Sequence, residues 1–198
     1  MRAYEEVRAA YMRVFDFDGT IYDGESLFDL YLFSAKYNPK VLRYIAPVLR
    51  YAIKYKLGRA TFDQMEYGVG KLCHGYLSEL AESTGMHSQF FALVGTYYGI
   101  GILSKTEPIS VKTQSFAPSD TSKDKESRGF LIAEFDNFYF LCTHYSLNAD
   151  DRDTATEWAI RFARQSDKTV FIAGDFNAQP TYPAMVTFKE YGFSILKN

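Results

Sequence analysis

The segment Thr169-Val170-Phe171-Ile172-Ala173-Gly174-Asp175-Phe176-Asn177-Ala178 joins a short apolar run to a polar turn. The apolar run is typical of a buried β-strand, and its glycine marks the point where the strand gives way to the turn. Asp175 and Asn177 stand two positions apart beyond this strand, so their side chains can share one site. A carboxylate there can orient or deprotonate water, and an amide can donate to a phosphate oxygen. An ordinary Asx turn after a strand is the alternative interpretation.

A second apolar strand is expected to end at His144. Residues 130–135 and 138–144 flank Asp136-Asn137, which is a two-residue signal for a β-hairpin. A histidine at the end of such a strand can donate a hydrogen bond to a developing oxyanion. A structural histidine with its hydrogen bonds satisfied is the alternative.

Apolar residues at helical spacing predict helices over residues 25–36, 39–57, 152–165 and roughly 182–190. Pro47 is expected to kink or divide the second of these helices. Thr154 and Glu157 are spaced as a capping box at the start of the third. Short strands broken by glycine and proline are expected between residues 88 and 111, and a polar loop over 116–128. The fold class is therefore α/β, with a helical N-terminal part followed by a mixed or antiparallel sheet flanked by helices.

The overall composition is that of an ordinary globular protein. Of the 198 residues, 47% are hydrophobic and 23% are charged, which excludes a disordered chain and a collagen-like repeat. The formal net charge of −2 gives no general attraction to nucleic acid or anionic lipid. Cys73 and Cys142 are too few for a disulfide framework, although they can pair with each other. The sequence has no apolar run long enough for a membrane-spanning helix, so we expect a cytoplasmic protein without stable membrane insertion.

One segment departs from this charge balance. Lys40, Arg43, Arg50, Lys54 and Lys56 give the helix expected over 39–57 a basic face beside its apolar residues. Such a face can contact lipid phosphates or nucleic acid. A solvated helix face is the more ordinary interpretation of a run of charges.

A further pair of carboxylates follows an apolar strand near the N-terminus, in Asp16-Phe17-Asp18-Gly19-Thr20. One carboxylate of such a pair can attack phosphorus while the second carries a proton, and a hard cation can hold the phosphate. Two solvated aspartates at the end of a strand are the alternative interpretation.

Residues 14–21 resemble the opening motif of the haloacid-dehalogenase-like phosphatase superfamily, and residues 27–72 are similar to the helical cap of one of its branches. The resemblance extends over about residues 10–72. It implies that Asp16 is the nucleophile and a magnesium ligand. It also implies that Asp18 is the general acid and base, and that the backbone carbonyl of Asp18 binds the metal as well.

Four segments in order resemble the endonuclease/exonuclease/phosphatase superfamily, whose members have the DNase-I-like fold. They are Gly99-Ile100-Gly101-Ile102-Leu103-Ser104-Lys105, Arg128-Gly129-Phe130-Leu131, Thr143-His144-Tyr145-Ser146-Leu147-Asn148 followed by Arg152, and Gly174-Asp175-Phe176-Asn177-Ala178. The resemblance extends over about residues 76–198 and implies a partial DNase-I-like sandwich. It implies that His144 and Asn177 contact phosphate or the transition state, and that Asp175 positions or activates water.

Three hypotheses about function stay open at this point. The chain is a phosphoester hydrolase with Mg²⁺ or Mn²⁺, using His144, Asp175 and Asn177, or it is a phosphomonoesterase that uses Asp16. In the third hypothesis the chain is not an enzyme. It is a chimera of segments 1–72 and 73–198 or a truncated chain, with two incomplete sites, or it is a binding module that keeps a phosphate pocket. The expected substrate is a phosphorylated small molecule, or a phosphodiester of a lipid or a nucleic acid.

Overall fold

The computed structural model of the chain describes residues 12–16, 39–60, 77–78, 81–82, 84–96, 98–123 and 125–195. The chain divides into two compact units, one made of Met1–Gly24 with Pro108–Asn198 and the other of Glu25–Glu107. Asp18 and the helix expected over 25–36 lie outside the described residues. The division into segments 1–72 and 73–198 stays a prediction.

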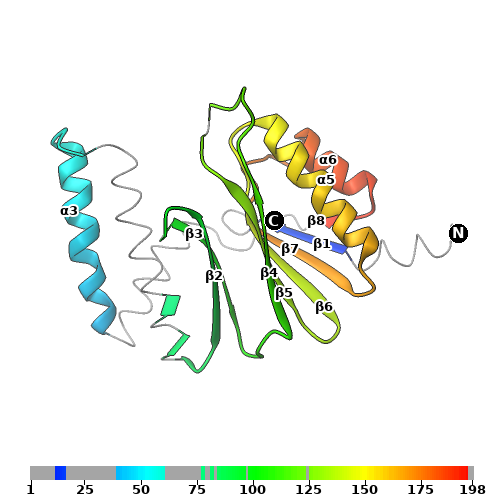
Figure 1. The fold of residues 1–198 in the computed structure, drawn as a ribbon, viewed down its shortest axis with the longest axis horizontal. Helices are drawn as coiled ribbons and strands as arrows, with labels where there is room; N and C mark the ends of the chain where they lie inside the picture. Colours follow the sequence, from blue (N-terminus) through cyan, green and yellow to red (C-terminus); the bar gives the residue numbers. More distant parts are fainter. Residues whose placement is uncertain are drawn as a thin grey trace, which may run out of the picture. The chain divides into compact units, whose positions relative to one another are not determined.

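The first unit contains a six-stranded sheet in the order β4-β5-β6-β7-β1-β8 (Figure 1). Its strands are β1 (Met12–Asp16), β4 (Ser110–Phe116), β5 (Arg128–Glu134), β6 (Phe138–His144), β7 (Thr169–Asp175) and β8 (Ser194–Ile195). Strands β4, β5 and β6 are antiparallel neighbours, whereas β6, β7, β1 and β8 run parallel to one another. The predicted α/β class with a mixed sheet is therefore confirmed. The sheet also takes in β1, from the part of the chain that was expected to be mainly helical.

The predicted hairpin between β5 and β6 is present. The two strands pair antiparallel around Asp136-Asn137, and the backbone N–H of Phe135 donates to the carbonyl of Phe138 at 2.9 Å. The polar residues between β4 and β5 form the connection that the sequence predicts.

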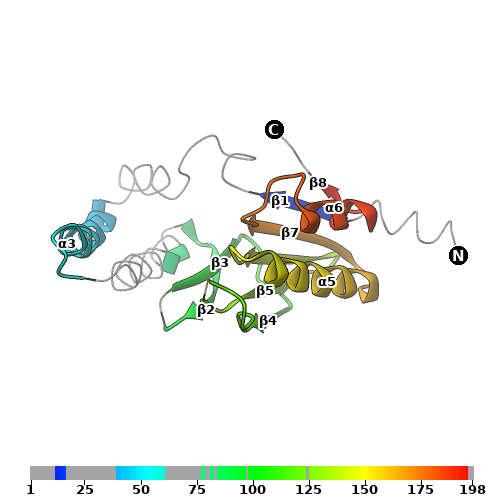
Figure 2. The ribbon, with the colours of Figure 1, turned by 90° about the horizontal axis from the view of Figure 1, so that it is seen from above.

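Two helices, α5 (Ala149–Gln165) and α6 (Pro183–Glu190), pack side by side on one face of this sheet (Figures 1 and 2). Helix α5 begins three residues earlier than predicted, after Asn148, with Asp150 and Asp151 in its first turn. Acidic residues stabilise this end of a helix. The capping box assigned to Thr154 and Glu157 was wrong, because the Thr154 hydroxyl lies inside the helix and donates to the carbonyl of Asp150 at 2.9 Å.

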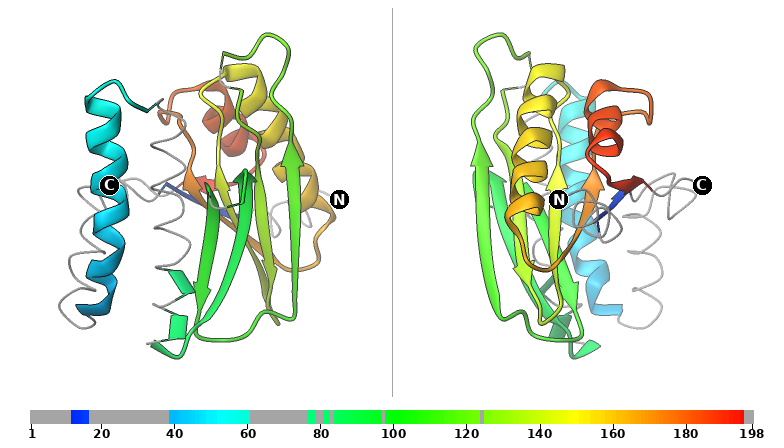
Figure 3. Two further views of the ribbon diagram at one scale, coloured as in Figure 1. Left: turned by 60° about the vertical axis from the view of Figure 1, so that its left-hand side comes forward. Right: turned by 90° about the vertical axis from the view of Figure 1, so that its right-hand side faces the viewer.

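The hydrophobic core of the first unit lies between the sheet and these two helices (Figure 3). Its most deeply buried side chains come from strands β5, β6 and β7, from the turns after β6 and β7, and from α6. They include Phe130, Leu141, Tyr145, Val170, Ile172, Phe176 and Phe188. Trp158 of α5 stacks on Phe130 with ring centroids 5.1 Å apart. Aromatic side chains bury large areas, so this cluster fixes the helices against the sheet and, with them, the ends of the strands.

The second unit contains the 3₁₀ helix η1 (Pro39–Tyr44), helix α3 (Ile45–Lys56) and the antiparallel pair β2 (His87–Val94) and β3 (Tyr98–Ser104). The helix predicted over 39–57 is thus divided, with Pro47 in the first turn of α3, where its missing N–H costs no hydrogen bond. Gly58 ends α3 at a φ of 65°, while the N–H of Arg59 donates to the carbonyl of Lys54. Among the described residues, no helix is long and apolar enough to cross a membrane.

Candidate functional site

The carboxyl ends of β6, β7 and β1 meet at one edge of the sheet. His144 is paired with Asp175 in the parallel register of β6 and β7, and Asp16 is paired with Gly174 in that of β1 and β7. The last residues of three strands therefore lie level with one another. Ligands in sheets with parallel strands bind outside the carboxyl ends of the strands, which makes this edge the natural place for a site.

Gly174 allows β6 and β7 to approach closely just before the site. Its φ is 146°, and a Cβ at this position would overlap the carbonyl oxygen of Thr143. Any other residue would have to push the two strands apart. The glycine that precedes Asp175 is therefore needed for the backbone itself, and it sets the distance between the strand ends that carry His144 and Asp175.

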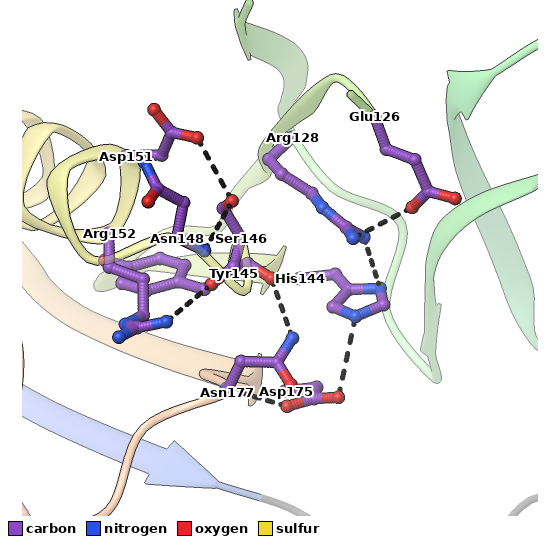
Figure 4. A network of polar contacts seen from close by, with 10 residues as sticks. All are labelled: Glu126, Arg128, His144, Tyr145, Ser146, Asn148, Asp151, Arg152, Asp175 and Asn177. Carbon is purple, nitrogen blue, oxygen red and sulfur yellow. Dashed lines mark hydrogen bonds and ion pairs between the residues drawn. The ribbon is translucent and has the colours of Figure 1, made fainter. Parts of the chain in front are cut away.

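His144 lies between Arg128 and Asp175 (Figure 4). Nη1 of Arg128 is 3.2 Å from Nδ1 of His144, and Nε2 of His144 is 3.5 Å from Oδ2 of Asp175. A guanidinium can only donate hydrogen bonds, so Nδ1 of the ring is the acceptor. From this we assign the neutral tautomer with its proton on Nε2, directed at the Asp175 carboxylate.

Arg128 was missed as a site residue in the sequence analysis, although it opens one of the four matching segments. It is buried, and its Nη2 forms an ion pair of 2.8 Å with Oε2 of Glu126. The ion pair fixes the orientation of the guanidinium, which in turn fixes the imidazole ring. An arginine at the start of a strand gives no sign in the sequence that it faces a histidine on the neighbouring strand.

Asn177 joins the turn after β7 to the turn after β6. Its side-chain Nδ2 donates to the carbonyl of Tyr145 at 2.8 Å, and its backbone N–H donates to Oδ1 of Asp175 at 2.8 Å. The second of these bonds is an Asx turn, so the alternative interpretation of this segment is confirmed. Asn177 has a φ of 46°, a conformation that asparagine tolerates better than most residues. One hydrogen of its amide is thus committed to the protein, and the second is left for a ligand.

A network of polar side chains holds the turn between β6 and α5. The buried Arg152 donates from Nη1 to the carbonyl of Ser146 at 3.0 Å, and the Ser146 hydroxyl donates to Oδ2 of Asp151 at 3.1 Å (Figure 4). Burial raises the pKa of Asp151, but hydrogen bonds from Ser119, Ser122 and Ser146 outweigh burial and hold that pKa below its ordinary value. A charged Asp151 therefore anchors the turn that follows His144.

A comparison of the chain with known protein families finds a match over most of its length. The match is to the Endonuclease/Exonuclease/phosphatase family, and it spans residues 32–195. The chain belongs to this family. A comparison with curated proteins finds no match.

The endonuclease/exonuclease/phosphatase match also corrects the extent of the resemblance inferred above. It begins at residue 32 instead of 76, so it includes most of the segment that was compared with a haloacid-dehalogenase-like cap. The comparisons give no support for that second superfamily. Asp16 and Asp18 precede the matched residues, and the roles assigned to them stay predictions.

Membership in the endonuclease/exonuclease/phosphatase family implies a divalent metal ion. Asp175 places a carboxylate at the sheet edge, with its side chain 61% exposed. In the part of the chain that the structure describes, however, no three histidine, cysteine, aspartate or glutamate side chains are grouped closely enough to hold an ion. Mg²⁺ is bound through carboxylates together with waters and substrate phosphate. The residues whose side chains the structure describes therefore do not make a metal site by themselves, and the metal roles predicted for Asp16 and Asp18 stay predictions.

Proposed function

We propose that the chain is a phosphoester hydrolase of the endonuclease/exonuclease/phosphatase type, dependent on Mg²⁺ or Mn²⁺, and that it acts at the carboxyl ends of β6 and β7. The observation that carries the proposal is the array of Arg128, His144 and Asp175, with the imidazole between a cation and a carboxylate. The substrate is a phosphorylated small molecule, or a phosphodiester of a lipid or nucleic acid.

In this proposal Asp175 and His144 act on water and on the phosphoester oxygen. The Asp175 carboxylate is open to solvent, and Asn177 and His144 each contact one of its oxygens. The remaining lone pairs of these two oxygens can orient a water molecule or accept a proton from it. Nε2–H of His144, held toward the sheet edge, can also donate to a phosphate oxygen that binds beside Asp175, where it stabilises charge that develops in the transition state. The remaining amide hydrogen of Asn177 can donate to the same phosphate.

The test is hydrolysis of bis(p-nitrophenyl) phosphate and p-nitrophenyl phosphate by the purified chain with Mg²⁺ or Mn²⁺. Asp175→Asn should lower kcat by roughly a hundredfold to ten-thousandfold, the effect of losing a general base. Removal of the divalent ion with EDTA should abolish turnover, and its return should restore it. If the metal-loaded protein hydrolyses neither ester, the proposal is wrong and the hypothesis of an inactive joined chain is favoured.

Asp136→Asn is the matched control. It makes the same change from carboxylate to amide on an exposed residue in the turn before β6, at the opposite end of that strand from His144. This variant should keep wild-type turnover. An equal loss in both variants would show that the Asp175 effect is not specific to the site.

A second candidate function rests on the register of β1. Because Asp16 is paired with Gly174, its Cα lies at the same sheet edge as Asp175. An aspartyl-phosphate mechanism on Asp16 would thus operate beside the array, and it predicts that beryllofluoride binds to the protein and that Asp16→Asn abolishes this binding. Loss of turnover in Asp16→Asn with full turnover in Asp175→Asn would favour this candidate over the first.

A further inference from the structure

Helix α3 and the 3₁₀ helix before it carry a row of exposed aliphatic side chains. Leu49, Ile53 and Leu57 are 51%, 56% and 61% exposed, and Leu42 is also exposed. Leu49, Ile53 and Leu57 are each four positions apart, a spacing that returns to the same side of the α-helix, and Leu42 precedes them in η1. Single exposed leucines are common on protein surfaces, but several exposed aliphatic side chains along one short helical segment mark a surface that binds something apolar.

Basic residues border this aliphatic row. Arg50 and Lys54 directly follow Leu49 and Ile53 and so lie along one side of the row, and Lys56 lies along the other. The segment from Pro39 to Arg59 contains six basic and no acidic residues. The whole chain carries −2, so the remaining residues together carry −8. The positive charge is therefore concentrated around the apolar row.

The length of α3 limits what this surface can bind. Its 12 residues extend for about 18 Å, whereas the hydrocarbon core of a bilayer is about 30 Å thick. The helix is too short to span a membrane, but it has the size and pattern of one that lies in the membrane surface. Such helices bury aliphatic side chains at the level of the headgroups, while lysine and arginine contact anionic phosphates.

We propose that α3 lies in the surface of bilayers that contain anionic phospholipids, with Leu42, Leu49, Ile53 and Leu57 between the acyl chains and Arg50, Lys54 and Lys56 at the phosphates. A nucleic acid would satisfy the basic residues and leave the aliphatic row in water. A second copy of the chain, docked by the same face, would bring two strongly positive segments together. An anionic bilayer covers the apolar row and neutralises its borders at the same time.

This inference does not depend on the proposed function, because none of the α3 residues belongs to the array of Arg128, His144 and Asp175. The excess negative charge on the rest of the chain would be repelled by the same lipid surface. Binding to the membrane would therefore run through α3 alone, without attraction of the other surfaces of the chain.

The test is sedimentation of the full chain with vesicles of phosphatidylcholine alone and of phosphatidylcholine with 30% phosphatidylglycerol. The wild type should bind the anionic vesicles, should bind the neutral ones at least tenfold more weakly, and should be released as salt is raised to 0.5 M. Arg50→Gln with Lys54→Gln should weaken binding by roughly twenty-five-fold, about fivefold for each charge near the surface. Leu49→Ser with Ile53→Ser should weaken it by roughly tenfold or more, through lost apolar burial.

Matched controls come from the other unit. Ile109→Ser and Arg161→Glu change an exposed aliphatic and an exposed basic residue there, and neither should alter vesicle binding. Each variant should keep the circular dichroism spectrum of the wild type, which shows that any lost binding is not lost folding.

Three outcomes would overturn the inference. The first is the absence of wild-type binding to anionic vesicles, and the second is equal binding by the Leu49→Ser, Ile53→Ser variant. The third is a dimer in analytical ultracentrifugation that these two substitutions convert to monomer in the absence of lipid, which would assign the row to a second copy of the chain. Because phosphoester hydrolysis is assayed separately on soluble esters, failure of this inference leaves the proposed function standing.

Discussion

Nε2 of His144 lies 3.5 Å from Oδ2 of Asp175, at the paired carboxyl ends of two parallel strands. The contact requires the ring to hold its proton on Nε2, and the Arg128 guanidinium on Nδ1 enforces that tautomer. The chemistry proposed for the histidine therefore depends on the arginine that contacts its other ring nitrogen.

Arg128 is expected to act as a positioning residue. Arg128→Met removes the donor to Nδ1, so the ring can adopt either tautomer, and kcat should fall by roughly tenfold to a hundredfold, as for other residues that orient a functional histidine. Arg128→Lys keeps one donor and should recover part of the loss. The ¹⁵N chemical shifts of the His144 ring report the tautomer directly. Wild-type shifts in the Met variant would contradict the assignment, whatever the activity.

Asn177 combines a backbone and a side-chain role, and two substitutions separate them. Asn177→Gly keeps the φ of 46° but removes the bond from Nδ2 to Tyr145, so kcat should fall by roughly one to three decades, as for one lost oxyanion-type donor. Asn177→Ala should lower kcat to the same extent. Its free energy of unfolding should also be about 1 kcal/mol lower than that of Asn177→Gly, because alanine is strained at positive φ. Activity assays and urea unfolding give the two values. Equal stability of the two variants would argue against the strain.

Gly174→Ala should destabilise the fold strongly. The new Cβ overlaps the Thr143 carbonyl in addition to the cost of the φ of 146°, and we expect a loss of about 3 kcal/mol or more in unfolding free energy. Gly95→Ala is the comparison, since its φ of 60° carries a smaller backbone cost and nothing lies within 4 Å of the new Cβ. Thermal melting followed by circular dichroism compares them. If the melting temperature of Gly174→Ala is as high as that of Gly95→Ala, β6 and β7 can separate at this position without a large cost.

Glu134 makes the free energy of unfolding depend on pH in the acid range. Hydrogen bonds from Lys168, at 2.7 Å, and from Ser110 lower the pKa of Glu134 from 4.5 to about 2. Between these values the unfolded chain binds more protons than the folded one, so this contribution to stability is complete above pH 4.5 and is lost as the pH falls to about 2. Glu134→Gln should make unfolding free energy less dependent on pH in that window.

Urea unfolding, followed by the fluorescence of Trp158 at pH steps between 5 and 2, tests this. Asp136→Asn, a change to an exposed carboxylate in the adjacent turn, is the control and should keep the wild-type dependence. If Glu134→Gln and the wild type lose stability in parallel, the Lys168 pair does not account for the acid sensitivity.

Local signals in the sequence were sufficient for the elements that the chain builds from neighbouring residues. The hairpin at Asp136-Asn137 was predicted because turn residues and alternating strands stand side by side, and α5 because its apolar spacing is regular. The start of α5 was misplaced because Thr154 and Glu157 have the spacing of a cap without its position. The sequence stretch from Gly174 to Asn177 points to the candidate site because strand, glycine and polar turn are contiguous.

The rest of the site depends on contacts between distant parts of the chain. Arg128 reaches His144 only because β5 and β6 pair with Gly129 opposite His144, which brings the first residue of β5 beside the last residue of β6. The placement of β1 beside β7 is likewise set by tertiary pairing. Neither relationship leaves a local pattern that sequence analysis can detect.

The position of β1 has a consequence for how the protein is made. Its partner β7 follows about 150 residues later, so on the ribosome the first strand is synthesised long before either of its neighbours exists. The antiparallel strands β4, β5 and β6 can pair as they emerge, whereas the edge that carries His144 and Asp175 is completed only after β7 and β8 have left the exit tunnel. During that interval β1 exposes unpaired backbone groups, which makes nascent chains a target for chaperones and for aggregation.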